Sequence, residues 1–366
     1  MGIELAVALV AIGIAAPLTF ALRLPTKVGR HIGPVHVPRI GGFAIVTAFI
    51  VSPFVVAAFS AEMRELIEHD QRSLLALGFF GFLVFLVGAR DDFRDVHWKP
   101  KLGIQVGAAL GLYVAGFRVG EVTVPVGGTL ELGLADPLVT VFWIVLLTNA
   151  MNLIDGRDGV AAGIAALVSG TMAYVAYDLN HELIAVLFAT LCGASLGFVP
   201  FNLPPARRLL GDSGAYFIGF TLGGLTLAGF VDSTGRVPLF IPICALALPI
   251  IDVGVAFLRR TLNGRPPFEA DTDHFHHRLE RQFRLGPLGV ALTIYGITAV
   301  FCLGALLLHV WYKSVGSAVV GGAVLLFALG LIAALGYIAT MWNSVRVSGW
   351  RGRPHPAAES NEPLKP

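Results

Sequence analysis

The chain has 366 residues, of which 55% are hydrophobic and only 14% are charged, and its mean hydropathy is +0.76. This composition excludes an ordinary soluble globular domain and predicts a polytopic membrane protein. The net charge of +2 is too small to favour a nucleic-acid partner, and three cysteines without CxxC spacing favour neither a disulfide framework nor a thiolate zinc site.

Apolar runs of roughly 20 residues, the length that crosses a hydrocarbon core, recur along most of the chain. We expect an all-α protein in which residues 1–345 form a single bundle of about eleven membrane-spanning helices. The first run lacks a basic segment and a clear cleavage site, so we expect a retained span rather than a signal peptide. The expected spans are residues 3–22, 41–60, 73–89, 102–117, 137–151, 159–177, 183–200, 214–231, 238–258, 288–310 and 316–342.

Two segments differ from this pattern. Residues 119–133 alternate polar and apolar side chains around a Gly-Gly pair, which predicts a small periplasmic β-hairpin outside the bilayer. Residues 346–366 follow the last span, and their end is rich in Pro, Glu and Ser, which predicts a disordered cytoplasmic tail.

The basic residues predict the orientation of the bundle. With the N-terminus outside, 21 of the 26 Lys and Arg residues fall in inner connections, as the positive-inside rule expects. Four polar clusters then emerge together on the cytoplasmic side. Turns without a function would fall on both faces, so this arrangement favours one site assembled from several loops.

The first cluster is the acidic end of the third span, which contains Asp91 and Asp92. Adjacent carboxylates repel each other, and each costs about 2.5–3.5 kcal/mol near the bilayer centre, so we expect them to be hydrated or to bind a cation. Mg²⁺ fits best, because it takes oxygen ligands and is typically held by one or two carboxylates with substrate phosphates. The alternative is pairing with nearby cations, namely Arg90, Arg94, Lys99 or Lys101.

The second cluster, residues 149–160, holds two Asn, two Asp and two Gly within its first eleven residues. Continued as a helix, Asn149, Asn152 and Asp155 recur every third residue and share one face, with Asp158 one step further. The alternative is a surface turn, since Asp-Gly pairs are common turn formers and Asn or Asp commonly caps a helix.

The third cluster is Gly211-Asp212-Ser213-Gly214 at the start of a span. Glycine permits close backbone approach, and a helix N-terminus offers N–H groups to a phosphate. The alternative is that Asp212 only caps the helix.

The fourth cluster, residues 271–280, contains His274, His276, His277 and Arg278. Because the HxHH spacing has no supporting Cys, we expect donors for a pyrophosphate rather than zinc ligands, although a solvated loop remains the alternative. The basic loop from Lys27 to Arg39 suits an anionic head group at the interface, or serves only as positive-inside anchoring.

Together these parts are what a phosphoryl-type transfer requires: acids for Mg²⁺, donors for phosphate oxygens and apolar walls beside them. We expect one water-soluble polyanionic substrate and one lipid substrate. The alternatives from other classes are a proton-coupled transporter, which would use the clustered carboxylates, and a membrane scaffold, which would need none of them.

The four motifs, in order, resemble those of the polyprenyl-phosphate N-acetylhexosamine-1-phosphate transferases of glycosyltransferase family 4, over roughly residues 25–285. The match is closer to members that start O-antigen, enterobacterial common antigen or teichoic-acid linkage units than to the muramoyl-pentapeptide branch. The resemblance implies transfer of a sugar 1-phosphate, such as GlcNAc-1-phosphate, from a UDP-sugar to undecaprenyl phosphate, with release of UMP. It also implies Mg²⁺ or Mn²⁺ and a cytoplasmic active site at the bacterial inner membrane.

The resemblance further assigns roles to residues. Metal binding is expected of Asp212, Asn152 and Asp92, and catalysis of Asp91, Asp92, Asp155 and Asp158. Substrate binding is expected of Asn149, Arg39, Gly211, His274, His276, His277 and Arg278. Departures from the family pattern are Arg157 where an apolar residue is common, Ala215 where Ser is usual, and Arg23 where an acid is usual. Of these, Arg157 is the one expected to alter the choice of nucleotide sugar.

Overall fold

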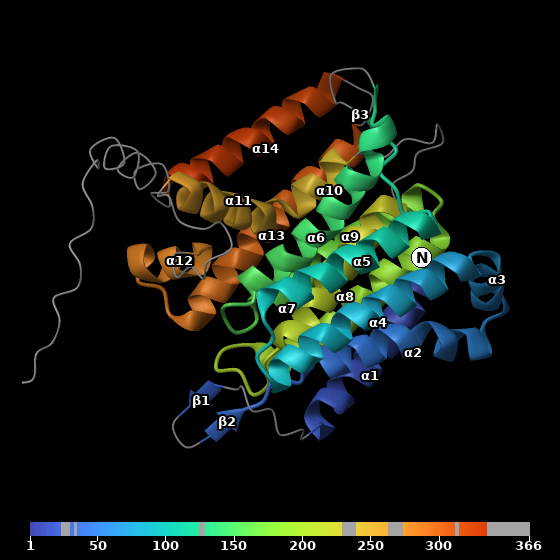
Figure 1. Ribbon diagram of the computed structural model, residues 1–366, viewed down its shortest axis with the longest axis horizontal. Helices are drawn as coiled ribbons and strands as arrows, with labels where there is room; N and C mark the ends of the chain where they lie inside the picture. The colour runs from blue at the N-terminus through green and yellow to red at the C-terminus, as the bar shows by residue number, and fades with distance from the viewer. Residues whose placement is uncertain are drawn as a thin grey trace, which may run out of the picture.

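The computed structural model describes residues 1–22, 30–32, 35–123, 129–228, 239–262, 274–311 and 315–334. Nearly all of these residues lie in helices that pack side by side in one bundle (Figure 1). Each of the eleven expected spans corresponds to a helix. These are α1 (Gly2–Ala21), α2 (Gly41–Phe59), α4 (Gln71–Phe93), α5 (Trp98–Ala115), α6 (Asp136–Ile154), α7 (Val160–Asp178), α8 (Glu182–Asn202), α9 (Gly211–Ala228), the pair α10 (Phe240–Ala245) and α11 (Ala247–Leu262), α13 (Pro287–Val310) and α14 (Val315–Ala334).

Seven of the helices in the described part of the chain are long and apolar enough to cross a membrane: α1, α2, α4, α6, α7, α8 and α13. The all-α polytopic membrane architecture is therefore confirmed. The predicted tail, residues 346–366, lies outside the described residues.

The centre of the bundle is formed by α8 and α9. Helix α8 packs against α1 and α7, and α9 packs against α4 and α6. Helix α9 is buried continuously from Ser213 to Leu227, and it is rich in Gly and Thr. A helix that faces protein on all sides does not need lipid-soluble side chains, and small residues let neighbouring backbones approach closely. This explains why α9 is not among the helices of the described part that are apolar enough to cross a membrane by composition alone.

One predicted span is broken. The expected helix 238–258 is instead α10 followed by α11, with Leu246 between them in a non-helical conformation. Pro249 lies in the first turn of α11, where a missing N–H costs no helical hydrogen bond.

Short elements lie at the two ends of the bundle (Figure 1). The expected hairpin is present, as β3 (Glu121–Thr123) and β4 (Thr129–Glu131) pair antiparallel, followed by the short helix η1 (Gly133–Ala135); the Gly-Gly pair lies outside the described residues. It shares its end of the bundle with α3 (Ala61–His69). At the opposite end lie α12 (Phe275–Phe283) and an unexpected antiparallel hairpin of β1 (Arg30–Ile32) and β2 (Val35–Val37).

Candidate active site

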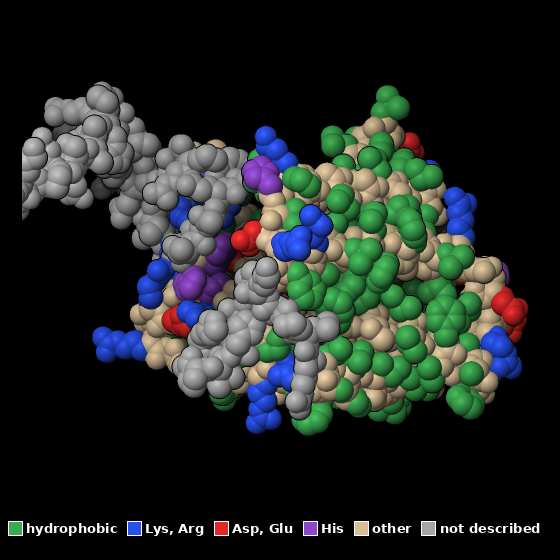
Figure 2. Space-filling view, turned by 60° about the horizontal axis from the view of Figure 1, so that its bottom comes forward, with side chains coloured by type: hydrophobic (Ala, Val, Ile, Leu, Met, Phe, Trp, Pro, Cys, Tyr) green, Lys and Arg blue, Asp and Glu red, His purple; other side chains and the backbone are tan. Residues whose placement is uncertain are grey.

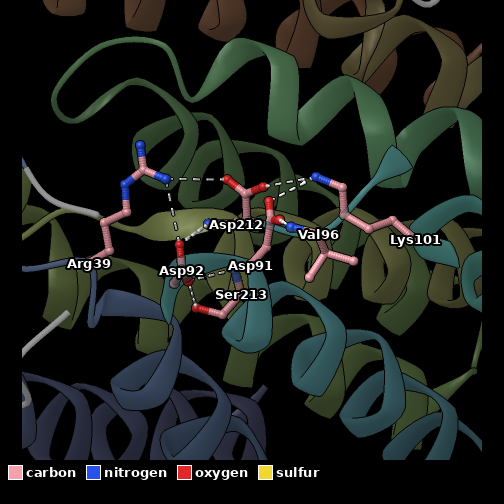
Figure 3. Close-up of polar contacts among 7 residues, drawn as sticks. All are labelled: Arg39, Asp91, Asp92, Val96, Lys101, Asp212 and Ser213. Carbon is pink, nitrogen blue, oxygen red and sulfur yellow. Dashed lines mark hydrogen bonds and ion pairs between the residues drawn. The ribbon is translucent and has the colours of Figure 1, made fainter. Parts of the chain in front are cut away.

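Asp92, the penultimate residue of α4, holds the beginning of α9. Its side chain is fully buried, and its carboxylate accepts hydrogen bonds from the backbone N–H of Asp212 (2.9 Å) and from the N–H (3.0 Å) and Oγ (2.6 Å) of Ser213 (Figure 3). The first N–H groups of a helix have no partner within it and carry partial positive charge, so a carboxylate there is stabilising. The contact joins the end of α4 to the start of α9.

Glycines allow the three backbones around this contact to meet. Gly211 has a φ of +79°, and a Cβ built on it would lie 2.6 Å from Oδ2 of Asp92. A Cβ on Gly88 of α4 would lie 2.6 Å from the carbonyl oxygen of Asp212. Gly42 of α2 packs in the same way on Gly214. The position of Asp212 is therefore fixed by backbone packing of α2, α4 and α9.

Asp212 lies between two cations from other elements (Figure 3). Its Oδ1 is 3.8 Å from Nη1 of Arg39, and its Oδ2 is 3.8 Å from Nζ of Lys101 on α5. Lys101 lies closer to Asp91, at 2.8 Å, and Asp91 also accepts a hydrogen bond from the N–H of Val96. The cation pairing considered as the alternative for this cluster is therefore realised for Asp91, through Lys101.

The loop between α6 and α7, residues 155–159, is held on three sides. Asp158 is buried and accepts a hydrogen bond from the N–H of Ala206. The N–H of Gly159 donates to Oδ1 of Asn202, and its carbonyl accepts from the hydroxyl of Tyr295. The sequence did not single out Asn202 or Tyr295. Because their role lies in contacts to a distant backbone, no local pattern could have revealed it.

Asn149 does not line the cavity that Asn152 and Asp155 of the same motif line. Its amide donates to Oε1 of Gln105 on α5 (2.7 Å) and to the carbonyl of Val145 one turn earlier. Asn152 and Asp155 line the cavity instead. The helix ends at Ile154, so the expected polar face is not continued as a helix to Asp155 and Asp158.

The start of α12 is fixed by a residue that the sequence analysis missed. Asp252 of α11 is buried, and its carboxylate accepts from the N–H of Phe275 (2.8 Å) and lies 3.1 Å from Nδ1 of His274. A carboxylate within a predicted membrane span is itself a signal of function, and that signal could have identified Asp252.

The histidines of α12 are neutral at physiological pH. Burial, with the neighbouring His277, lowers the pKa of His276 to about 3, and burial with Arg157 lowers the pKa of His277. The Nδ1 atom of His276 is buried and has no hydrogen-bond partner among the described residues. Neutral imidazole still donates one hydrogen bond, so these side chains suit the recognition of ligand oxygens rather than long-range attraction.

A cavity of about 540 Å³ collects most of the predicted residues at this end of the bundle. Figure 2 shows acidic, basic and histidine side chains gathered there, while apolar side chains cover much of the rest of that face. The predicted residues that line the cavity are Arg39, Asn152, Asp155, Asp158, Gly211, Asp212, His274, His276 and His277. Asp91 and Asp92 support the wall from α4, and Arg278 is buried in α12.

The donor set of the cavity fits a magnesium ion. Burial and the nearby Asp212 carboxylate raise the pKa of Asp155 well above its ordinary value, and a divalent cation would relieve that crowding. Among the described residues no three His, Cys, Asp or Glu side chains form a ready-made metal site. Mg²⁺ does not require one, because one or two carboxylates with water and substrate phosphates suffice. The metal role of Asp212, Asn152 and Asp92 stays a prediction.

Known proteins match this chain over most of its length. A family model for glycosyl transferase family 4 matches residues 74–230. A probable undecaprenyl-phosphate N-acetylglucosaminyl 1-phosphate transferase of Bacillus subtilis (strain 168) is 35% identical over 295 residues, which cover 78% of this chain and 79% of the relative. A decaprenyl-phosphate N-acetylglucosaminephosphotransferase of Mycobacterium tuberculosis (strain CDC 1551 / Oshkosh) is 29% identical over 307 residues, which cover 78% of this chain and 75% of the relative. A phospho-N-acetylmuramoyl-pentapeptide-transferase of Halalkalibacterium halodurans is 28% identical over 292 residues, which cover 75% of this chain and 84% of the relative.

Proposed function

Because the chain belongs to glycosyl transferase family 4 and its relatives are named as transferases, we propose that it transfers a sugar 1-phosphate from a UDP-sugar to undecaprenyl phosphate, releasing UMP. GlcNAc-1-phosphate or a related N-acetylhexosamine 1-phosphate is the proposed group. The reaction is the first membrane step of a cell-envelope glycan of the O-antigen, common-antigen or teichoic type. It takes place on the cytoplasmic face of the bacterial inner membrane.

The observation that carries this proposal is the shared cavity. Asn152, Asp155 and Asp212 lie on its wall together with His276 and His277, although the two groups are more than 60 residues apart in sequence. Oxygen ligands on one side suit a metal-bound diphosphate, and neutral imidazole donors suit its remaining oxygens. The relatives that accept polyprenyl phosphates support a lipid acceptor beside this cavity.

In the proposed reaction, an oxygen of the lipid phosphate attacks the β-phosphorus of the UDP-sugar. The bond from that phosphorus to the bridging oxygen breaks, and UMP leaves. Asp212, Asn152 and Asp92 would hold Mg²⁺, which would neutralise charge on the diphosphate, and Asp155 and Asp158 would contribute to the catalytic centre beside it. Asp91 accepts the proton of the lipid phosphate, and Arg39 and Lys101 balance the charge of the carboxylate cluster.

The rival route makes an Asp the nucleophile and passes through a phospho-enzyme. Incubation with radiolabelled UDP-sugar without lipid phosphate distinguishes the two. Direct attack predicts no stable labelling of the protein. Release of UMP together with a stably labelled protein would establish the two-step route.

The test of the function is UMP release by purified protein in detergent, supplied with UDP-GlcNAc, undecaprenyl phosphate and Mg²⁺. Omission of the lipid phosphate, omission of the metal, and the substitution Asp212→Asn should each abolish release. A panel of UDP-sugars then identifies the donor. Folded protein that binds Mg²⁺ but releases no UMP from any UDP-sugar would overturn the proposal, and transport would be tested next.

A further inference from the structure

Helix α12 is attached to the rest of the protein on two sides. On one side Asp252 of α11 holds its first turn, as described above. On the other side the guanidinium of Arg157, in the loop between α6 and α7, donates a hydrogen bond to Oε2 of Glu280. The same Nη2 atom lies 3.4 Å from Nδ1 of His277. The ion pair therefore joins two segments whose paired residues are 123 positions apart, and both segments contribute residues to the cavity wall.

The two segments also pack directly on each other. A Cβ on Gly156 would lie 2.5 Å from Cε1 of His276, so only glycine lets the loop approach the ring. The ion pair borders this contact, and its two side chains are only 31% and 23% exposed. A pair at the edge of a packed contact is ordered by that packing, unlike most ion pairs on an open surface.

The order of charged residues in the loop indicates why Arg157 needs an acidic partner. Arg157 follows Asp155 and precedes Asp158, so one cation is inserted among the carboxylates of the site. Its partner Glu280 lies on α12 and is not on the cavity wall, whereas Arg157 is. The pair thus neutralises a cation next to the cavity and at the same time ties α12 to the loop.

We propose that Arg157 and Glu280 are a positioning pair that keeps α12 docked on the α6–α7 loop, so that His276 and His277 stay on the wall of the cavity described above. Its effect on turnover rests on the proposed function, but its effect on docking does not. The competing role for Arg157 is direct binding of the donor. In that case Glu280 would be dispensable.

The docking is tested without any substrate by hydrogen–deuterium exchange of residues 275–283 in the variants Arg157→Gln, Glu280→Gln and the double substitution. Each single variant should raise exchange of α12 about fivefold, the upper range for one partly exposed ion pair. The double variant should exchange no faster than either single variant, because the lost interaction is shared. Additive effects, or unchanged exchange in the single variants, would overturn the proposal.

The matched control is Asp178→Asn, which neutralises the carboxylate that lies 2.8 Å from Nε2 of His309 near the other end of the bundle. It should leave exchange of α12 unchanged. Loss of protection in α12 in this control would mean that any lost ion pair loosens the bundle, and the proposal would fall.

The UMP assay separates positioning from donor binding. Any increase of the KM for UDP-GlcNAc should be equal in the two single variants and no larger in the double variant, with kcat within about twofold of wild type. An increase confined to Arg157→Gln would instead identify Arg157 as a donor ligand and overturn the pairing. Failure of all variants, wild type included, to release UMP would count against the proposed function alone, since exchange is measured without turnover.

Discussion

At the scale of single residues, the structure gives Asp92 a definite contact. The sequence and the family resemblance assign it to the metal and to catalysis. The structure shows its carboxylate directed at the N-terminus of α9, with three hydrogen bonds from Asp212 and Ser213. Because that contact sets the place of Asp212 on the cavity wall, Asp92 affects the site through position even before any metal binds.

We predict that Asp92→Asn lowers the free energy of unfolding by about 1–3 kcal/mol, because an amide offers one acceptor oxygen to three donors and its N–H₂ is brought near those donors. Denaturant unfolding of wild type and variant in detergent measures this difference in the free energy of unfolding. The nearby Asp95→Asn is the control, since the exposed Asp95 side chain should contribute less than about 0.5 kcal/mol. Unchanged stability with lost Mg²⁺ binding would instead make Asp92 a metal ligand.

A second prediction concerns the pH dependence of His276. Its pKa of about 3 in the folded protein lies below the ordinary value of 6.5, so between these values the unfolded chain binds more protons than the folded one. The contribution of His276 to the free energy of unfolding is fully present above about pH 6.5 and is lost as the pH falls toward 3. We therefore expect the Tm of the wild type to fall more between pH 7 and pH 5 than that of His276→Gln.

The comparison with His276→Gln is needed because Asp155 acts with the opposite sign. Its raised pKa means that the folded state keeps a proton that the unfolded chain releases, so this group favours the folded state at low pH. Asp155 is present in both proteins, so the difference between their curves isolates His276. Parallel curves for the two proteins would contradict the burial of a neutral imidazole.

At the scale of elements, the contact between α4 and α9 depends on glycine. We predict that Gly88→Ala destabilises the protein by about 1–3 kcal/mol, because its Cβ would lie 2.6 Å from backbone atoms of Asp212 and Ser213, which cannot move independently of α9. Since α9 carries Asp212, a displacement of about 1 Å should also cost about 10²-fold in UMP release.

The control for this variant is Gly78→Ala, three turns earlier in α4, where a Cβ would meet nothing within 4 Å. It should be neutral or slightly stabilising, because alanine favours helix more than glycine does. Equal losses in the two variants would show that helix propensity rather than backbone contact is responsible.

The elements themselves were largely predictable. Long apolar runs determine where spans lie, so every expected span has a helix. Hydropathy does not detect the break at Leu246, because an interrupted apolar run has the same composition as a continuous one. It also missed β1 and β2, although the Gly33-Pro34 pair between them is a recognisable turn signal.

Within the site, the motifs predicted which segments meet but not the direction of each side chain. Asp212 and His277 reach the cavity as expected, whereas Asn149 turns to Gln105. The direction of the Asn149 side chain depends on which helix packs against that face of α6. The sequence alone does not show that α5 packs beside Asn149. Tyr295 was missed for the same reason, since it acts on a backbone far away in sequence, whereas Asp252 carries a sequence signal, a carboxylate within a predicted span.

At the scale of the whole molecule, α12, which contributes His276 and His277 to the cavity wall, lies at one end of the bundle, and the β3–β4 hairpin lies at the other (Figure 1). We predict that the cavity end is cytoplasmic. In a chain without its native cysteines, Leu130→Cys should react with a membrane-impermeant maleimide on intact cells, and Arg281→Cys only after the membrane is opened. Both positions are exposed in the structure.

Reversed labelling would invert the orientation predicted from the basic residues. Labelling of both positions from one side would show that the number of crossings between the hairpin and α12 is even rather than odd. A cysteine-free chain serves as the background control, and its UMP release confirms that the replacements preserve the fold.

The bond between Asp92 and the start of α9 has a consequence for biosynthesis. The partners are 120 residues apart, so at about 5–20 residues per second the ribosome takes about 6–24 s to make α9 after α4 has entered the membrane. Throughout that interval a carboxylate at the end of an inserted helix lacks its native hydrogen-bond donors. The nascent chain must keep this end of α4 hydrated or shielded by the insertion machinery, and the first half of the bundle closes only when its later helix arrives.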